Sequence, residues 1–446
     1  MEIVFGTDGV RGIANIELTA ELVLALGKAT GSIVSAGRDQ CTVLVGMDTR
    51  VSSDMLEAAL CAGMQSSGVD VLRCGVVPTP VVAALARIFK AEAGAVISAS
   101  HNPAEYNGVK FFSGEGFKLP DEMEERIEQC VAGNGDTMRL VGPRTGRSHL
   151  IHDAAARYAD HVMAGTTVDL KGRKLVVDCA NGAATTVAPM LLRRLEADVV
   201  LMNADPDGFN INKGCGALHP EAMQHMVLEN QAFGGLSFDG DADRVLMSDE
   251  KGRILDGDRM MLLAARKLKD EGALTNDLVV GTVMSNMGFE VALRKAGISL
   301  VRAPVGDRYV LEEMKRLGAV LGGEQSGHII FLNHTTTGDG LITALQVLST
   351  AVLSGKPLSE LASDMVEYPQ VLENVRVSGR DRWKSVSELT DAVERAKLRL
   401  GDDGRVLIRP SGTEPLLRVM VEGRDQSLVK QIVRELADLA HKHLRD

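Results

Sequence analysis

The chain has 446 residues, 60 of them acidic and 49 basic, and its formal net charge is −11. This acidic balance excludes a general binder of nucleic acids or anionic membranes, since both attract a basic protein surface. Aromatic residues make up only 3% of the chain, which excludes an aromatic platform for stacking single-stranded bases.

Short apolar runs alternate with amphipathic helical patterns through most of the chain. The alternation predicts βαβ units and largely parallel sheets. The helix after the predicted strand Thr42–Met47 is expected to begin with Asp54 and Glu57 as a capping pair. The next helix is expected to be capped by Thr79, with Pro80 at its first position. The predicted strands are, in chain order, Thr42–Met47, Val69–Arg73, Ala93–Ser98, Lys174–Asp178, Phe233–Phe238 and Leu278–Thr282.

The last segment of the chain has a different pattern, which predicts a small α+β domain. A strand pair is expected near residues 370–378 and a helix near 386–399. Two further strands, at 404–409 and 416–422, precede a charged helix that begins at 424. Polar stretches between these patterns are interpreted as linkers. The chain is therefore predicted to form four domains, at residues 1–145, 146–249, 250–364 and 365–446.

Three aspartates at a spacing of two, Asp239, Asp241 and Asp243, follow one of the predicted strands. Carboxylates in this pattern can converge on one hard cation, and magnesium is favoured because it leaves positions for a phosphoryl oxygen. An EF-hand calcium loop is rejected, since its sixth position must be glycine and here it is Arg244. Two alternatives stay open, an aspartyl phosphatase with Asp239 as covalent nucleophile and a solvated acidic turn.

A serine, Ser100, comes directly after another predicted strand, where open α/β sheets place reacting groups. It is followed by His101 and by an Asn-Pro pair that prevents a helix from starting. Ser100 is a candidate nucleophile or phosphate carrier, although an isolated Ser-His pair is usually a capping or surface feature. Lys110, just beyond this loop, is a candidate phosphate clamp, or a proton-transfer group if desolvation lowers its pKa.

A loop of small residues between two predicted strands holds Arg409, Ser411, Gly412 and Thr413. Hydroxyls, backbone amides and a guanidinium together suit an oxyanion, and Arg418 on the following strand adds charge. The alternative interpretation is an ordinary hairpin turn.

Another glycine-containing loop carries Glu324 and Ser326, which alternate on one face and suit adjacent hydroxyls of a sugar. His328, in the same loop, is interpreted as a packed histidine whose hydrogen bonds are satisfied. Near the N-terminus, Arg11 lies on a glycine-rich turn and is a candidate clamp for a phosphoryl group, the alternative being a surface arginine. The segment Asp48–Arg50 is a candidate structural ion pair.

Taken together, these motifs resemble those of the α-D-phosphohexomutases. The resemblance covers nearly the whole chain, and the motifs keep the family's order, which makes it far more specific than any single loop. Gln325 and the segment Asn210–Gly216 resemble the branch of the family that acts on glucosamine phosphates. The matching segments are, in chain order, FGTDGVRG, ISASHNP, DGDADR, GGEQSGH and RPSGTEP.

The resemblance implies four domains around a central cleft, three related α/β units with mixed sheets and a smaller C-terminal α+β unit. It implies a phosphoserine at Ser100, which with the three aspartates would hold one Mg²⁺ per chain. The loop at 409–413, with Arg418, would bind the phosphate of the substrate, and Glu324 and Ser326 its ring hydroxyls. The candidates for charge stabilisation and proton transfer are Arg11, Arg244, Lys110 and His101.

The implied reaction interconverts glucosamine 6-phosphate and glucosamine 1-phosphate through a sugar 1,6-bisphosphate, which also primes the enzyme. It would feed the synthesis of UDP-N-acetylglucosamine and cell-wall precursors. The alternatives are a mannose or glucose phosphate mutase of the same superfamily, a magnesium-dependent sugar phosphatase, and a sugar-phosphate binder without catalysis.

The expected partner is a small hexosamine phosphate, and the expected assembly is a monomer or a homodimer. No nucleic acid is expected as a partner, because the net charge of the chain is acidic. No membrane is expected as a partner either, because no apolar run approaches the roughly 18 residues of a transmembrane helix. The first residues carry no basic and apolar signal, and the six cysteines form no CxxC pair. Reduced thiols and a cytoplasmic location are therefore expected.

Overall fold

A computed structural model describes residues 5–6, 8–133, 135, 137–411 and 415–445 of the chain. It divides into two compact units, which are described separately. The larger unit comprises Met1–Met284 and Gly297–Ser363, and the smaller comprises Ser285–Ala296 and Asp364–Asp446. Among the described residues, no helix combines the length and the apolar character that crossing a bilayer would require.

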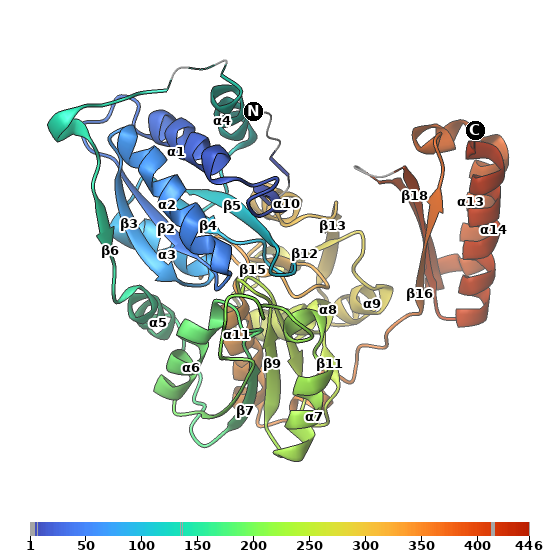
Figure 1. Cartoon of the computed structure of the whole chain (residues 1–446). Helices are drawn as coiled ribbons and strands as arrows, with labels where there is room; N and C mark the ends of the chain where they lie inside the picture. The colour runs from blue at the N-terminus through green and yellow to red at the C-terminus, as the bar shows by residue number, and fades with distance from the viewer. Residues whose placement is uncertain (1–4, 7, 134, 136, 412–414, 446) are drawn as a thin grey trace. The chain divides into compact units, whose positions relative to one another are not determined.

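Strands and helices alternate as the sequence predicts (Figure 1). The strands are β1 (Val10–Ile13), β2 (Thr42–Met47), β3 (Asp70–Val76), β4 (Ala93–Ile97), β5 (Tyr106–Ser113), β6 (Ser148–Leu150), β7 (Lys174–Asp178), β8 (Asp198–Met202), β9 (Gly234–Phe238), β10 (Val245–Ser248), β11 (Ile254–Leu255), β12 (Leu278–Thr282), β13 (Ser299–Ala303), β14 (Leu321–Gly323), β15 (Ile329–Phe331), β16 (Gln370–Arg376), β17 (Gly404–Pro410) and β18 (Leu416–Gly423). The α-helices are α1 (Ala20–Val34), α2 (Val51–Ser66), α3 (Thr79–Phe89), α4 (Asp121–Val131), α5 (Ala154–Ala164), α6 (Ala184–Arg194), α7 (Glu221–Glu229), α8 (Gly257–Asp270), α9 (Met287–Lys295), α10 (Asp307–Leu317), α11 (Gly340–Ser354), α12 (Leu358–Leu361), α13 (Ser387–Leu400) and α14 (Gln426–Leu444).

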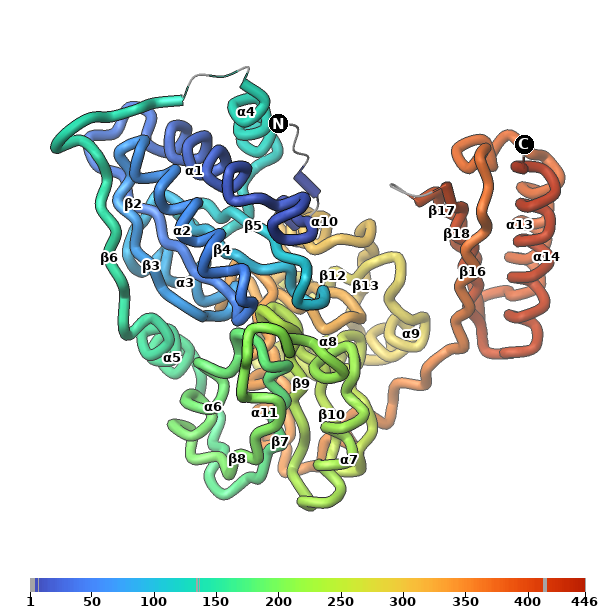
Figure 2. Tube along the Cα trace, in the orientation of Figure 1, coloured from blue at the N-terminus to red at the C-terminus, as the bar shows by residue number. Residues whose placement is uncertain are grey.

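The larger unit contains three mixed sheets, and each of them joins parallel strands to an antiparallel edge. The strand orders are β1-β5-β4-β2-β3-β6, β11-β10-β9-β7-β8 and β13-β12-β14-β15. In the first sheet β4, β2, β3 and β6 run parallel, whereas β5 and β1 are antiparallel to their neighbours. The chain leaves this sheet through β6 and enters the second at α5 and β7 (Figure 2). The predicted α/β class is thus confirmed for three successive domains.

The central strands of the first sheet, β2 and β4, are almost wholly buried, which explains why they read as continuous apolar runs. Val43 and Val45 belong to the core that also includes residues of α1, α2 and α4. On the opposite face, glycines admit α3: a Cβ on Gly46 or Gly94 would lie within 3 Å of a methyl group of Val82. The ends of these strands are therefore held rigidly between two helical layers.

The smaller unit is an α+β domain, as predicted, built on the antiparallel sheet β16-β18-β17. The expected strand pair near 370–378 is wrong, because this segment forms the single strand β16, which pairs along its whole length with β18. Helices α13 and α14 contribute most of the apolar core that covers the sheet. The helix α9 belongs to this unit too, since the buried Glu422 accepts a hydrogen bond from the N-terminal amide of Met287.

Two predicted helix caps are wrong. Helix α2 begins at Val51, so Asp54 and Glu57 lie inside it and cap nothing. Helix α3 begins at Thr79 itself and has no side-chain cap. The threonine hydroxyl accepts no hydrogen bond from the helix N–H groups and instead donates to a distant aspartate, Asp241.

Candidate active site

The structure brings Ser100 and the three aspartates together. Ser100 follows β4, and the aspartates lie in the turn between β9 and β10, 139 residues further along the chain. The Ser100 hydroxyl donates to Oδ2 of Asp239 at 2.7 Å. One carboxylate oxygen from each of the three aspartates lies within 4.8 Å of the others, and all three residues are buried. The solvated acidic turn is thereby excluded.

Backbone contacts fix the position of Ser100. Its φ of +51° is in the left-handed region, which a non-glycine residue occupies at a cost of order 1–3 kcal/mol and only where the surroundings enforce it. The Ser100 carbonyl accepts hydrogen bonds from the Arg50 guanidinium at 3.2 Å and the Asn212 amide at 2.9 Å. A Cβ on Gly240 would lie 2.5 Å from the same carbonyl oxygen, so glycine is needed for the two loops to approach each other. The expected ion pair of Asp48 and Arg50 is present and buried beneath this loop.

The acidic triad has room for a cation. Asp241 Oδ1 and Asp243 Oδ1 are buried without a hydrogen-bond partner among the described residues. Burial and the charges of Asp243 and Asp241 raise the pKa of Asp239 well above its ordinary value. Carboxylate oxygens that are crowded, desolvated and partly unsatisfied are the ligands that a hard divalent cation prefers. The residues present therefore fit a magnesium ion.

Lys110 reaches the same aspartates from β5. Its Nζ lies 2.8 Å from Asp241 Oδ2, 3.4 Å from Asp243 Oδ2 and 2.9 Å from Asp8 Oδ2. Burial lowers the pKa of Lys110, but the charges of Asp241, Asp8 and Asp243 outweigh burial and hold that pKa above its ordinary value. The expectation of a lowered pKa is therefore wrong. It rested on desolvation alone, whereas the fold also places carboxylates beside Lys110 that raise its pKa.

Two further candidates, His101 and Arg11, lie near Ser100. His101 Nδ1 is 3.2 Å from the Ser100 hydroxyl. Burial, together with the charges of Arg244 and Arg11, lowers the pKa of His101 to about 4, so the imidazole is neutral near pH 7. Arg11 is three-quarters buried, forms an ion pair with Asp8 and lines a cleft, which excludes its interpretation as a surface arginine.

This cleft has a volume of about 440 Å³ and lies within the larger unit. Arg11, His101, Arg244 and Glu324 are among the residues that line it. Burial lowers the pKa of Arg244, but the charges of Asp243, Asp239 and Glu324 keep it above its usual range. The Arg244 guanidinium therefore stays positive in a cleft of sugar-phosphate size.

The predicted sugar loop contributes to the cleft through Glu324, whose Oε1 accepts a hydrogen bond from the Gly306 amide at 3.0 Å. The hydroxyl of Ser326 donates to Oε2 of Glu324 at 3.3 Å, so the two side chains are neighbours, as expected. The interpretation of His328 as satisfied is wrong. Its side chain is buried, but within the described parts of the chain neither ring nitrogen has a hydrogen-bond partner, and Nε2 lies 3.6 Å from Asp307 Oδ2.

Sequence reasoning missed three charged residues and one hydroxyl in this region. Asp8 binds Lys110 and Lys118, and Lys118 Nζ reaches Asp307 Oδ2 at 2.5 Å. Thr79 Oγ1 donates to Asp241 Oδ2 at 2.6 Å. Asp8 lies three residues before Arg11 and forms an ion pair with it. This short spacing is the one feature of the sequence that could have identified Asp8 as a residue of the site. Nothing local in the sequence marks the other three.

The predicted phosphate loop lies in the smaller unit. Arg409 on β17 and Arg418 on β18 are directly opposite each other in the register of the two strands. Burial and the charge of Arg418 lower the pKa of Arg409, which indicates that two like charges are held close together. Such a pair destabilises a sheet unless an anion compensates it. Ser411 is buried beside this pair, whereas Gly412 and Thr413 lie outside the described residues.

Comparison with known proteins assigns each region of the chain to a phosphosugar mutase domain. The phosphoglucomutase/phosphomannomutase α/β/α domains I, II and III match residues 2–138, 156–252 and 256–368, and the C-terminal domain of that family matches residues 372–439. The chain therefore belongs to the phosphoglucomutase/phosphomannomutase family, within the phosphohexomutase superfamily that its motifs resemble. It is an isomerase of the intramolecular phosphotransferase class.

Full-length relatives are more specific than the domain matches. A protein of Thermoanaerobacter sp. (strain X514) is 50% identical over 446 residues, which is all of both chains, and is called phosphoglucosamine mutase. A protein of the same name from Carboxydothermus hydrogenoformans is 52% identical over 98% of this chain and 99% of its own.

Solved structures agree on the fold. A phosphoglucomutase/phosphomannomutase family protein from Burkholderia thailandensis superimposes with a TM-score of 0.84 at 25% identity, over 99% of this chain and 98% of the other. The N-acetylphosphoglucosamine mutase of Aspergillus fumigatus, solved with GlcNAc-6P and magnesium, superimposes with a TM-score of 0.70 at 19% identity, over 99% of this chain and 96% of its own.

Proposed function

We propose that the protein interconverts glucosamine 6-phosphate and glucosamine 1-phosphate, with Ser100 as the phosphoryl carrier. The observation that supports this most is the 2.7 Å hydrogen bond between the Ser100 hydroxyl and Asp239, in a buried site where two other aspartates keep unsatisfied oxygens. The full-length relatives named phosphoglucosamine mutase support the choice of sugar.

Asp239, Asp241, Asp243 and an oxygen on Ser100 would together hold one Mg²⁺. When bound, magnesium supplies neutralisation of the negative charge on the transferring phosphoryl group. Arg50 and Asn212 hold the Ser100 backbone while Ser100 gives its phosphoryl group to O1 of glucosamine 6-phosphate, which forms the 1,6-bisphosphate. The phosphate on O6 then returns to Ser100, which leaves glucosamine 1-phosphate, so the same bisphosphate can prime an unphosphorylated serine.

The remaining candidate residues are assigned by charge and position. The paired guanidinium groups of Arg409 and Arg418 bind the phosphate that is not being transferred, with Ser411, Gly412 and Thr413 adding hydroxyl and amide donors. Glu324 and Ser326 accept and donate hydrogen bonds to ring hydroxyls or to the sugar amine. An anion bound between the two arginines would offset the repulsion between their like charges.

Arg11, Arg244 and Lys110 stabilise the negative charge of the phosphoryl group in the transition state. His101, neutral and 3.2 Å from the Ser100 hydroxyl, can accept its proton. None of the six cysteines, all of them among the described residues, forms a disulfide, which supports a reducing, cytoplasmic setting. The expected monomer or homodimer, and the role in supplying cell-wall precursors, belong to this proposal too.

The test is a head-to-head assay by phosphorus NMR of glucosamine 6-phosphate, glucose 1-phosphate and mannose 1-phosphate, each with Mg²⁺ and a trace of the matching 1,6-bisphosphate. We expect the glucosamine phosphates to interconvert fastest and no free phosphate to accumulate. The intact mass of the protein should show an excess of one phosphate that maps to the peptide containing Ser100. Faster turnover of the glucose or mannose phosphates would instead identify the mutase of those sugars.

The Ser100→Ala variant separates the mutase from a phosphatase. In the mutase the serine carries the phosphoryl group, so the variant should lose nearly all turnover and the extra mass. A phosphatase that uses Asp239 as its nucleophile would keep its activity in this variant and would release phosphate. Ligand binding without any exchange of label between the protein and the sugar would indicate a binding protein.

A further inference from the structure

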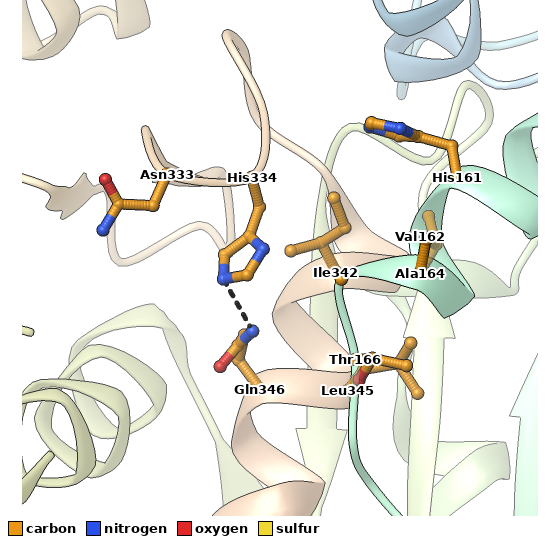
Figure 3. Close-up of a pocket in the computed structure, with 10 residues that line it drawn as sticks. His161, Val162, Ala164, Thr166, Asn333, His334, Ile342, Leu345 and Gln346 are labelled. Atoms are coloured by element: carbon orange, nitrogen blue, oxygen red, sulfur yellow. Dashed lines mark hydrogen bonds between the residues drawn. The ribbon is translucent and has the colours of Figure 1, made fainter.

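A second cavity, of about 240 Å³, lies in the larger unit, and none of the residues that line it also lines the catalytic cleft. Its walls come from α5, from the loop that carries His334 and from α11 (Figure 3). We propose that this cavity binds a small organic anion, a carboxylate or a phosphate ester with an apolar portion.

A chain of hydrogen bonds determines which nitrogen of His334 carries the proton. Lys267 can only donate, and its Nζ lies 2.9 Å from Gln346 Oε1. The amide nitrogen of Gln346 therefore faces His334 and donates to Nε2 at 3.1 Å, the contact drawn in Figure 3. In the neutral imidazole the remaining proton must then be on Nδ1.

The cavity thus receives one directed donor. Nδ1 of His334 lies on the side of the cavity that the end of α5 forms, since an added Cβ on Gly165 would lie 3.5 Å from it. Gln346 connects this N–H to the ammonium group of Lys267, which polarises the hydrogen-bond chain and strengthens the donor. An acceptor oxygen with negative charge is the complementary ligand group.

The charges around the cavity have the sign that an anion requires. The charge of Lys267 acts on His334 and that of Arg87 on His161, in each case lowering the pKa of the imidazole in addition to the effect of burial. No acidic residue is among those that line the cavity. The carboxylate of Glu271 is 3.7 Å from Lys267 Nζ and is half exposed, so it neutralises this ammonium group only weakly.

The rest of the lining is apolar. Val162 on α5 and Ile342 and Leu345 on α11 face the cavity, and the hydroxyl of Thr166 supplies a second polar group at its edge. A bare inorganic ion would leave this apolar surface uncovered, whereas a small ring or branched chain would cover it. For this reason the ligand is assigned an apolar portion.

The probe that tests the proposal is benzoate, titrated into the full-length protein and followed by nitrogen-proton correlation of the imidazole rings of its 10 histidines. We expect the His334 and His161 signals to shift saturably, and the uncharged isostere benzamide to bind at least tenfold more weakly. Phenyl phosphate is titrated separately, and its affinity is measured from the shift of the His334 signal. Tighter binding of phenyl phosphate than of benzoate indicates a phosphate ester as the ligand, and weaker binding indicates a carboxylate.

Two lysines on α8 provide a matched pair of variants. Lys267→Met should weaken benzoate binding at least fivefold, because the charged end of the hydrogen-bond chain is removed. Lys269→Met should change it by less than twofold, since Nζ of that lysine binds the Gly297 carbonyl instead. His334→Phe, which keeps the ring but removes the donor, should abolish the shift of His161.

Three results would overturn the proposal. The first is benzamide binding as tightly as benzoate in the wild-type protein, a comparison that needs no variant. The second is a shift of the His101 or His328 signals alone, which would place the probe in the catalytic cleft. The third is an equal effect of the two lysine variants.

Discussion

Thr79 uses its hydroxyl to orient Asp241 rather than to cap α3. Oδ2 of the same carboxylate also accepts from Lys110, so its other oxygen, Oδ1, stays turned to the place where a cation would bind. Partners of this kind fix the direction of a metal ligand, and their loss usually lowers metal affinity by about 10–100-fold.

We therefore predict that Thr79→Val raises the Mg²⁺ concentration for half-maximal turnover about tenfold. Thr79→Ser keeps the hydroxyl and should remain within about twofold of the wild type. Magnesium titrations of initial rates measure both values, and a Val variant that titrates like the Ser variant would exclude this role for the hydroxyl.

The arginine pair of the smaller unit has opposite effects on binding and on stability. Arg409→Ala removes a charge-assisted phosphate contact of about 1.5–3 kcal/mol, so we predict a KM raised at least tenfold. The melting temperature should not fall, because the substitution also removes the repulsion by Arg418 across the strands. Arg409→Lys is the control that keeps the charge. An unchanged KM in steady-state kinetics would contradict the assignment of Arg409 to the phosphate site.

At the level of elements, α1 and α2 cross at two glycines. A Cβ on Gly27 would lie 2.3 Å from the Leu60 carbonyl oxygen, and one on Gly63 would lie 2.3 Å from that of Leu24. The helices pack backbone to backbone at this crossing, which brings α2 close enough to cover the first sheet. Helix α2 begins directly after the Asp48–Arg50 pair that supports the Ser100 loop.

Gly63→Ala should therefore lower the local free energy of unfolding of α1 and α2 by about 1–3 kcal/mol, the usual effect of overpacking. The backbone carbonyl that the new methyl group meets cannot move aside as a flexible side chain could. Hydrogen exchange of the α1 and α2 amides measures the change. Ala62→Ser, at an exposed neighbouring position, should leave the exchange rates unchanged; equal rates in both variants would contradict the close crossing.

At the scale of the whole larger unit, α5 and α11 are joined by a buried hydrogen bond from Tyr158 to Asp339. The Asp339 carboxylate also accepts from the amides of Leu341 and Ile342 at the start of α11. Burial raises the pKa of Asp339 to about 6, against the opposing effect of these hydrogen bonds. Near pH 5, Asp339 is therefore mostly protonated in the folded protein, whereas it is mostly ionised in the unfolded chain.

A raised pKa makes the contribution of Asp339 to stability largest below about pH 4, and that contribution is lost as the pH rises through 6. Asp339→Asn keeps the cap but does not titrate. We predict that the wild-type melting temperature, relative to that of the variant, falls between pH 5 and pH 7.5. A difference between the two melting temperatures that does not change with pH would contradict the raised pKa of Asp339.

Local sequence patterns were enough to predict many of the strands and the loops that carry the candidate site residues. The predicted strands Thr42–Met47, Lys174–Asp178 and Leu278–Thr282 coincide with β2, β7 and β12. Apolar periodicity and the polar turns that follow it are local properties, so they can be recognised in a window of about 11–18 residues. The motifs at Ser100 and at the three aspartates are equally local, which is why their order alone indicated the family.

The electrostatics of the site, in contrast, depend on contacts between residues far apart in the chain. Lys110 keeps its charge because of Asp241, 131 residues away, and Thr79 finds its acceptor 162 residues away. The network of Asp8, Lys118 and Asp307 likewise joins turns from the first and third domains. Burial and neighbouring charge shift a pKa by comparable amounts in opposite directions, so their balance cannot be known until the fold has placed both partners.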